Sequence, residues 1–345
     1  MLDKLGLHIK ISQHKKAILR YLLGAITALL ISTLNGILLP QIAAIFTLML
    51  LDKGKNALGI KKSLIAIMAL YALGWFGLFL GGFVQNYIIE TLLILGLVIY
   101  WSFRLIKIPE AIRLLFLVLT LLFPFLSLTA EPLADLILGD MIINLVIALA
   151  ITQFAFLILP ETSIDLQKTP QKKKNNETTY SIDKIALNGV YVIMPAVLYF
   201  YFFGTNAFVL TFVFISFLAL DPFIYKSKKG YGLIIANLIG GVAGIIAYFL
   251  LTITPTFFFY VFLMCAIGLF FSYHIFSATK NVPIYSIAFR TFFLVMGVIS
   301  NSSNSAGDTV TLRLFGIALA VLYVIIAYKI VTYFNDPITY ENETV

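Results

Sequence analysis

Cysteine is almost absent from the sequence, since Cys265 is the only one among 345 residues. A single thiol excludes an intramolecular disulfide framework and a thiolate metal site. Histidine is also scarce, and His8, His14 and His274 are far apart along the chain. We therefore expect no metal site and no cofactor.

Charged residues make up only 12% of the sequence, whereas 61% of the residues are hydrophobic and the mean hydropathy is +1.00. A soluble domain of this length cannot cover so much apolar surface. The composition excludes a soluble protein and predicts a chain embedded in a lipid bilayer.

Sequence motifs of soluble enzymes are missing as well. The chain contains no Gly-rich phosphate loop ending in Lys-Ser/Thr, no HExxH and no GxSxG nucleophile elbow. We therefore expect that the protein is not an enzyme and does not hydrolyse ATP itself. Active transport, if present, would use an ion gradient or an external motor.

Apolar stretches of 15 to 25 residues recur along the chain without the alternation that the strands of a membrane β-barrel require. They predict an all-α protein with about twelve transmembrane helices. The expected spans are 17–34, 37–51, 63–82, 86–106, 110–129, 137–159, 185–203, 206–221, 231–252, 255–276, 283–300 and 309–332. The second and eighth are short for a bilayer core about 30 Å thick, so each could be tilted, re-entrant or in a thinned membrane.

Positive charge is absent from alternate loops. With a cytoplasmic N-terminus, all 24 lysine and arginine residues except Arg313 lie in inner loops or at the helix ends beside them. This distribution follows the positive-inside rule and places both termini in the cytoplasm. It also accounts for the net charge of +8 without nucleic acid as a partner.

The chain also repeats itself. Residues 17–52 align without a gap on 186–221, and both segments end in an aspartate followed by a lysine-rich loop. Gly139-Asp140 matches Gly307-Asp308 at the start of each half's last span. Six spans per half is an even number, so two parallel repeats are expected. The predicted organisation is an N-terminal segment 1–16, a first repeat 17–160, a cytoplasmic linker 161–184, a second repeat 185–333 and a cytoplasmic tail 334–345.

Ionisable residues inside spans cost about 2.5–3.5 kcal/mol each on insertion scales, so each is a candidate for function. Arg290 and Arg313 are candidates for binding an anionic substrate. Glu90 is a candidate proton-coupling carboxylate or an ion-pair partner of Arg313, and a buried carboxylate is the alternative partner of Arg290. Asp308 and Asp140 join this set as coupling or ion-pair residues, although each also fits a helix N-terminus, where an anion complements the helix dipole.

Glycines gather in the third span of each half. Their spacing indicates close helix packing, with lining of a substrate path as the alternative. The residues concerned are Gly74, Gly77, Gly81, Gly240, Gly241 and Gly244.

These features together resemble the fusaric acid resistance and aromatic acid exporter (FUSC-like) superfamily, in a compact bacterial branch without a large cytoplasmic domain. The resemblance spans 17–333 and rests on the short first hairpins (AIFTLMLLDKGKN, ISFLALDPFIYKSKKGYG), the Gly-rich helix NLIGGVAGIIAY and the last helix GDTVTLRLFGIALA. Among the candidate residues, Gly240, Gly241, Gly244 and Arg313 fall at family-like positions.

The resemblance implies a component of the bacterial inner membrane that exports small, often aromatic, carboxylic acids. It also implies proton coupling, a periplasmic adaptor of the membrane-fusion type and a homo-oligomer. Plant organic-anion channels resemble the same superfamily, so a passive anion channel is an alternative. A membrane scaffold that transports nothing is a second alternative.

Overall fold

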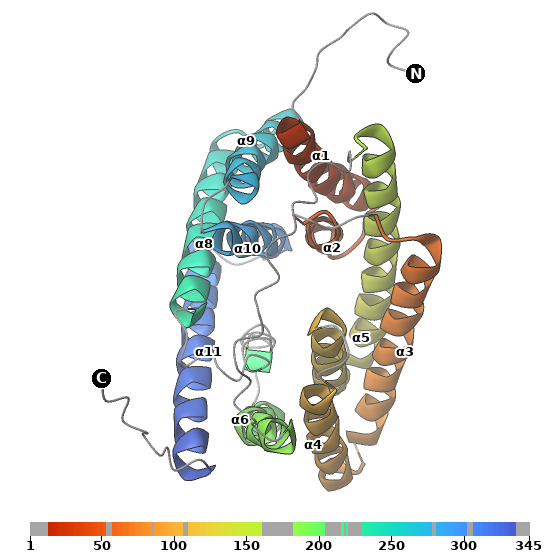
Figure 1. Ribbon diagram of the computed structural model, residues 1–345, viewed down its shortest axis with the longest axis vertical. Coiled ribbons are helices and arrows are strands. Elements are labelled where there is room, and N and C mark those ends of the chain that lie inside the picture. Colours follow the sequence, from red (N-terminus) through yellow and green to blue (C-terminus); the bar gives the residue numbers. More distant parts are fainter. Residues whose placement is uncertain are drawn as a thin grey trace, which may run out of the picture. The chain divides into compact units, whose positions relative to one another are not determined.

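The computed structural model describes most of the chain and consists of helices (Figure 1). Helix accounts for 91% of it, and no strand occurs among the residues it describes. Those residues are 13–52, 57–84, 86–105, 110–160, 182–203, 215, 216, 219, 229–277, 281–301 and 306–335, and some side chains within these ranges, among them 306–314, lie outside the description.

The helices follow one another with short connections. They are α1 (Gln13–Leu34), α2 (Gln41–Leu50), α3 (Ile60–Val84), α4 (Ile88–Arg104), α5 (Glu110–Ile158), α6 (Ile182–Phe203), α8 (Lys229–Ile253), α9 (Phe257–Phe276), α10 (Val282–Asn301) and α11 (Ala306–Asn335). Helices are the expected form, because a backbone in lipid must satisfy its hydrogen bonds within its own segment.

Six stretches within these helices are long and apolar enough to cross a membrane. Among the described residues, these are His14–Leu34, Ile60–Val84, Pro132–Ile158, Asp183–Phe203, Ile235–Ile253 and Phe257–Phe276. Large apolar side chains remain exposed along them, for example Trp75, Phe79 and Phe262. The protein is therefore an all-α membrane protein, as its composition predicts.

Helix α5 differs from the sequence-based expectation. The spans predicted at 110–129 and 137–159 belong to one helix of 49 residues, with Pro124 and Pro132 inside it. Its apolar parts still form two stretches, Phe116–Ser127 and Pro132–Ile158. Proline is tolerated in membrane helices when neighbouring groups satisfy the carbonyl that it frees, so the polar residues near 131–140 do not end the helix.

The helices form two compact units. The first contains 1–65, 140–173 and 238–306, and the second contains 66–139, 174–237 and 307–345. Neither unit coincides with a predicted sequence half, because each takes segments from both.

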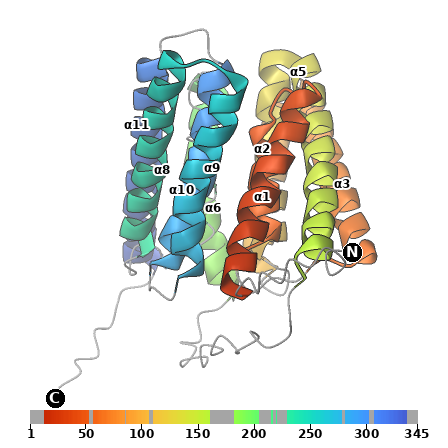
Figure 2. The ribbon, with the colours of Figure 1, turned by 90° about the horizontal axis from the view of Figure 1, so that it is seen from above.

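In the first unit, α1 packs on α2 and α9, and α10 packs on α9 and α2. The view from above shows α9 and α10 side by side (Figure 2). Aromatic rings fill the space between these helices. Phe271 stacks on Phe289 with ring centroids 5.2 Å apart, and Tyr21 of α1 meets Phe276 edge to face at 5.4 Å.

In the second unit, α4 packs on α6. Its core joins buried apolar residues of α3, α4, α5, α6 and α11, among them Leu80, Phe103, Phe125, Phe200 and Tyr328. Both units thus bury a hydrophobic core inside the membrane-embedded part of the chain.

Candidate functional site

The turn between α1 and α2 is set by glycine. Gly36 has φ +68°, a left-handed conformation that favours glycine. Its N–H donates to the carbonyl of Thr33, and the next N–H, that of Ile37, donates to the carbonyl of Ser32. This pair of bonds is the Schellman motif that ends a helix, so the chain leaves α1 in a fixed direction toward α2.

Two polar side chains of α5 hold this turn in place. Asp140 accepts a hydrogen bond from the backbone N–H of Leu38 at 2.9 Å. Asn144, one turn further along and fully buried, donates to the carbonyl of Leu39 and accepts from the hydroxyl of Ser32 at 2.6 Å. Asp140 therefore lies inside a helix and tethers the α1–α2 turn.

Helix α2 is too short to cross the membrane. Its 10 residues span about 15 Å, half of a bilayer core of about 30 Å. The helix ends at Leu50, and Asp52 follows after Leu51, whose N–H donates to the carbonyl of Thr47. The short helix thus brings a carboxylate to the interior of the first unit.

Arg290 of α10 meets that carboxylate. Its Nη2 lies 2.9 Å from Oδ2 of Asp52, and each side chain is about one quarter exposed, at 26% and 25%. The same Nη2 donates to the hydroxyl of Ser286 at 3.2 Å. Arg290 is the ninth residue of α10, so the pair lies about 12 Å along the helix from its start.

The pair leaves polar atoms unsatisfied. The Nε of Arg290 is buried without a hydrogen-bond partner in the described part of the chain. The same holds for the hydroxyl of Tyr21, a fully buried residue of α1 within electrostatic reach of Arg290 and Asp52. Native proteins pair nearly all such groups, so this cluster has capacity for one more polar ligand.

The chemistry available is anion binding. A guanidinium carries five N–H donors in a planar fork that matches a carboxylate. In Arg290 the internal carboxylate of Asp52 occupies one corner of that fork, while Nε remains unused. A second carboxylate can compete with Asp52 for the same cation.

The other predicted candidates lie elsewhere. Glu90 is exposed in the first turn of α4, in the second unit. Arg313 and Asp308 lie in α11, but their side chains are outside the described residues. The coupling role of Glu90 and the substrate role of Arg313 therefore stay predictions.

Sequence reasoning did not assign Asp52 or Tyr21 to the site. Asp52 was a landmark of the internal repeat and counted as part of an inner loop. A signal was present, because a span too short for the bilayer ends its chain inside it, and the charge that follows such a span then lies at membrane depth. Tyr21 carried no signal beyond being a tyrosine in an apolar run.

The glycines of the third spans lie against neighbouring helices. A Cβ on Gly77 would lie 2.7 Å from the carbonyl oxygen of Leu119, and one on Gly244 would lie 2.7 Å from the side chain of Val295. The side chain of Leu138 fills the space at Gly74 in the same way. Cβ atoms at Gly81 and Gly240 would likewise overlap their neighbours, and Gly241 is buried.

Comparisons of the chain with protein-family models, with curated proteins and with solved structures found no match.

Proposed function

We propose that the protein is a membrane transporter for small organic anions, with aromatic carboxylates as the leading class. The observation that carries the proposal is the ion pair of Arg290 and Asp52 at the end of a half-length helix, with a spare guanidinium donor beside it. Transporter sites are commonly built where a helix stops inside the membrane.

Asp52 acts in this proposal as the internal substitute for the substrate. Arg290 is costly in a membrane unless a negative charge neutralises it. In the resting protein Asp52 supplies that charge, and a substrate carboxylate takes its place on binding. Protonation of Asp52 would release the guanidinium, so this carboxylate is better placed than the exposed Glu90 to couple a proton to binding.

The composition of the two units supports the proposed twelve-span duplication. The first unit combines α1, α2 and the end of α5 with most of α8 and with α9 and α10. In the predicted repeats these are spans one, two and six of the first half and spans three, four and five of the second. The second unit has the complementary set in α3, α4, the start of α5, α6 and α11, while the expected eighth span lies mostly outside the described residues.

Equivalent contacts recur inside both units, as a duplication would produce. The first span of one half packs on the fourth span of the other, as α1 on α9 and as α6 on α4. The third span approaches the fifth at a glycine, so that a Cβ would overlap a backbone carbonyl at Gly77 with Leu119 and at Gly240 with Ala288. These parallels support two parallel repeats that exchange three spans each.

The remaining parts of the proposal come from the charge pattern and from the resemblance to the FUSC-like superfamily. Lysine and arginine place both termini in the cytoplasm. The resemblance favours the bacterial inner membrane, a periplasmic adaptor and a homo-oligomer, with export as the direction of transport.

Flux of labelled benzoate through the purified protein in liposomes tests this function. The wild-type protein should exchange benzoate across the bilayer, and Arg290→Gln should lower the initial rate at least tenfold because the anion loses the cation that binds it. Arg313→Gln tests the second predicted arginine in the same assay. An imposed pH gradient should drive accumulation if transport is proton-coupled and should have no effect on a passive channel.

Arg104→Gln is the matched control. Arg104 also pairs with an aspartate, Asp183, at 3.2 Å, but their side chains are 44% and 56% exposed at the end of α4. This variant should transport benzoate at the wild-type rate. Equal rates for Arg290→Gln and the wild type at equal protein abundance would refute the assigned site, and a wild-type protein that passes no benzoate would favour the scaffold alternative.

A further inference from the structure

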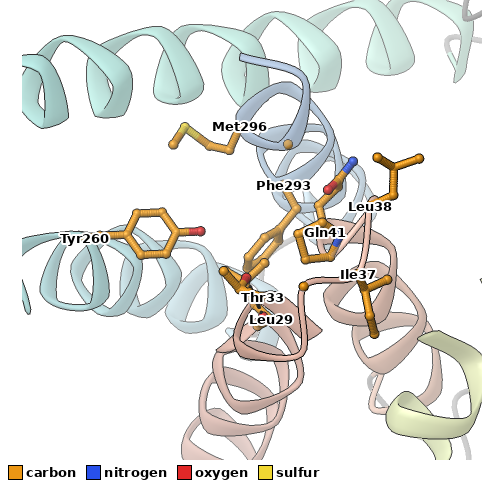
Figure 3. A pocket seen from close by; sticks show the side chains of 11 residues that line it. Leu29, Thr33, Ile37, Leu38, Gln41, Tyr260, Phe293 and Met296 are labelled. Carbon is orange, nitrogen blue, oxygen red and sulfur yellow. Dashed lines mark hydrogen bonds between the residues drawn. The ribbon is translucent and has the colours of Figure 1, made fainter. Parts of the chain in front are cut away.

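A cavity of about 330 Å³ lies in the first unit beside the α1–α2 turn, away from the Arg290 pair. Its volume is within the range of roughly 300–1,000 Å³ that small-molecule pockets occupy. Figure 3 shows its wall, with Thr33 and Leu29 from α1, Tyr260 from α9, and Phe293 and Met296 from α10.

One buried polar group in the cavity wall lacks a partner. Gln41, the first residue of α2, is 6% exposed, and its Oε1 has no hydrogen bond to any described residue. No side-chain cap bond is made at this helix end, where Pro40 precedes it. An amide oxygen buried in this way costs about 1–3 kcal/mol unless a donor reaches it.

The surrounding residues are shaped to hold this glutamine. A Cβ on Gly297 of α10 would lie 2.5 Å from Nε2 of Gln41 and would overlap its side chain. The turn that carries the cavity wall is fixed by Gly36 and by the hydrogen bonds from Asp140 and Asn144. The amide therefore occupies a prepared position between α2 and α10.

The lining decides the class of ligand. None of the described residues that line the cavity is charged, so a buried anion would find no counter-ion there. The rings of Tyr260 and Phe293 and the thioether of Met296 favour a flat aromatic body. The Tyr260 hydroxyl points toward the α1–α2 side in Figure 3.

We propose that this cavity binds a small uncharged aromatic molecule whose hydroxyl group donates a hydrogen bond to Gln41. Phenols have this chemistry at neutral pH, and so do aromatic acids in their protonated form. The site differs from that of Arg290, which takes the anionic form, and binding to it does not depend on the direction or coupling of transport.

Fluorine NMR of the purified protein in detergent tests the proposal, with 4-fluorophenol and 4-fluoroanisole as probes and empty micelles as the partition reference. The two probes have similar bodies, but only the phenol has a donor. The wild type should bind 4-fluorophenol about tenfold more tightly, since one buried hydrogen bond is worth about 1.4 kcal/mol. Equal affinities, or no saturable binding of the phenol, would overturn the proposal, and this comparison requires no variant.

Variants locate the site. Gln41→Met keeps the side-chain length and removes the acceptor, so the preference for the phenol should disappear. Gly297→Ala should have the same effect by displacing Gln41. Gln153→Met is the control, because Gln153 donates to the carbonyl of Leu58 in the same unit and does not line the cavity. A preference that persists in Gln41→Met would overturn the assignment.

The assay separates this inference from the proposed function. It uses no gradient and measures no flux, so Arg290→Gln should bind 4-fluorophenol as the wild type does. Benzoate at pH 7 should not displace the phenol, because the cavity lacks a cation. Displacement by benzoate would overturn the restriction to uncharged ligands without bearing on transport.

Discussion

Asn144 is a fully buried amide whose side chain connects three elements. It donates to the carbonyl of Leu39 and accepts from Ser32, so that α5, α1 and the start of α2 are joined through one residue. Both partners lie in the membrane-embedded part of the chain, where water is not available to replace a lost hydrogen bond. The turn that shapes the cavity therefore depends on this residue.

Asn144→Leu should destabilise the protein by about 1–3 kcal/mol, because Ser32 and the Leu39 carbonyl would lose their partner while remaining buried. The midpoint of thermal unfolding in mild detergent measures the effect. Ser32→Ala removes one of the two partners, so adding it to Asn144→Leu should cost less than Ser32→Ala costs in the wild type. Additive effects of the two substitutions would contradict the shared hydrogen bond.

Individual residues show how far the sequence could predict the site. Arg290 stood out because an arginine inside an apolar run must find a negative partner. The identity of that partner could not be predicted, since Asp52 and Arg290 are 238 residues apart and only the packing of α2 on α10 joins them. The role of Asp140 was equally inaccessible, because its bond is to a backbone amide that has no side-chain signature.

At the scale of elements, the third helix is held by glycines on one face. Gly77 lies against the backbone of α5, where Leu119 cannot move aside without shifting its helix. Gly82, five residues on in α3, has no neighbouring atom within 4 Å of the position that a Cβ would take. The two glycines therefore offer a matched pair within one helix.

Gly77→Ala should destabilise the protein by about 1–3 kcal/mol through overpacking. Gly82→Ala should be neutral or stabilising by up to about 1 kcal/mol, because alanine is the better helix former. Unfolding midpoints of the two variants under the same detergent conditions make the comparison. Similar midpoints for both would show that α3 and α5 do not pack closely at Gly77.

The helices themselves were largely predictable, because each long apolar run has to satisfy its backbone internally. The boundary near 130 was not. Glu131, Asp135 and the glycine before Asp140 read as a polar outer connection, whereas the structure continues α5 through them. Polar residues at a membrane surface are compatible with either a loop or a helix, and sequence periodicity does not distinguish the two.

At the scale of the whole molecule, the compact units do not follow the order of the chain. A duplicated sequence folds most simply into two separate halves, but here each unit is completed by segments of the other half. Such an exchange makes the halves interdependent for folding. Sequence landmarks can reveal the repeat, yet they carry no information about which spans pack together, because apolar helix faces are interchangeable in composition.

The central claim is that Arg290 binds an organic anion in competition with Asp52. Benzoate-dependent thermal unfolding of Asp52→Asn tests it most directly, because a ligand that binds the native state raises its stability in proportion to its affinity. Removing the internal competitor should tighten benzoate binding about tenfold or more, so benzoate should raise the unfolding midpoint of Asp52→Asn further than that of the wild type. Arg290→Gln should show no benzoate effect. A benzoate effect that is equal in the wild type and Asp52→Asn, or that persists in Arg290→Gln, would contradict the account.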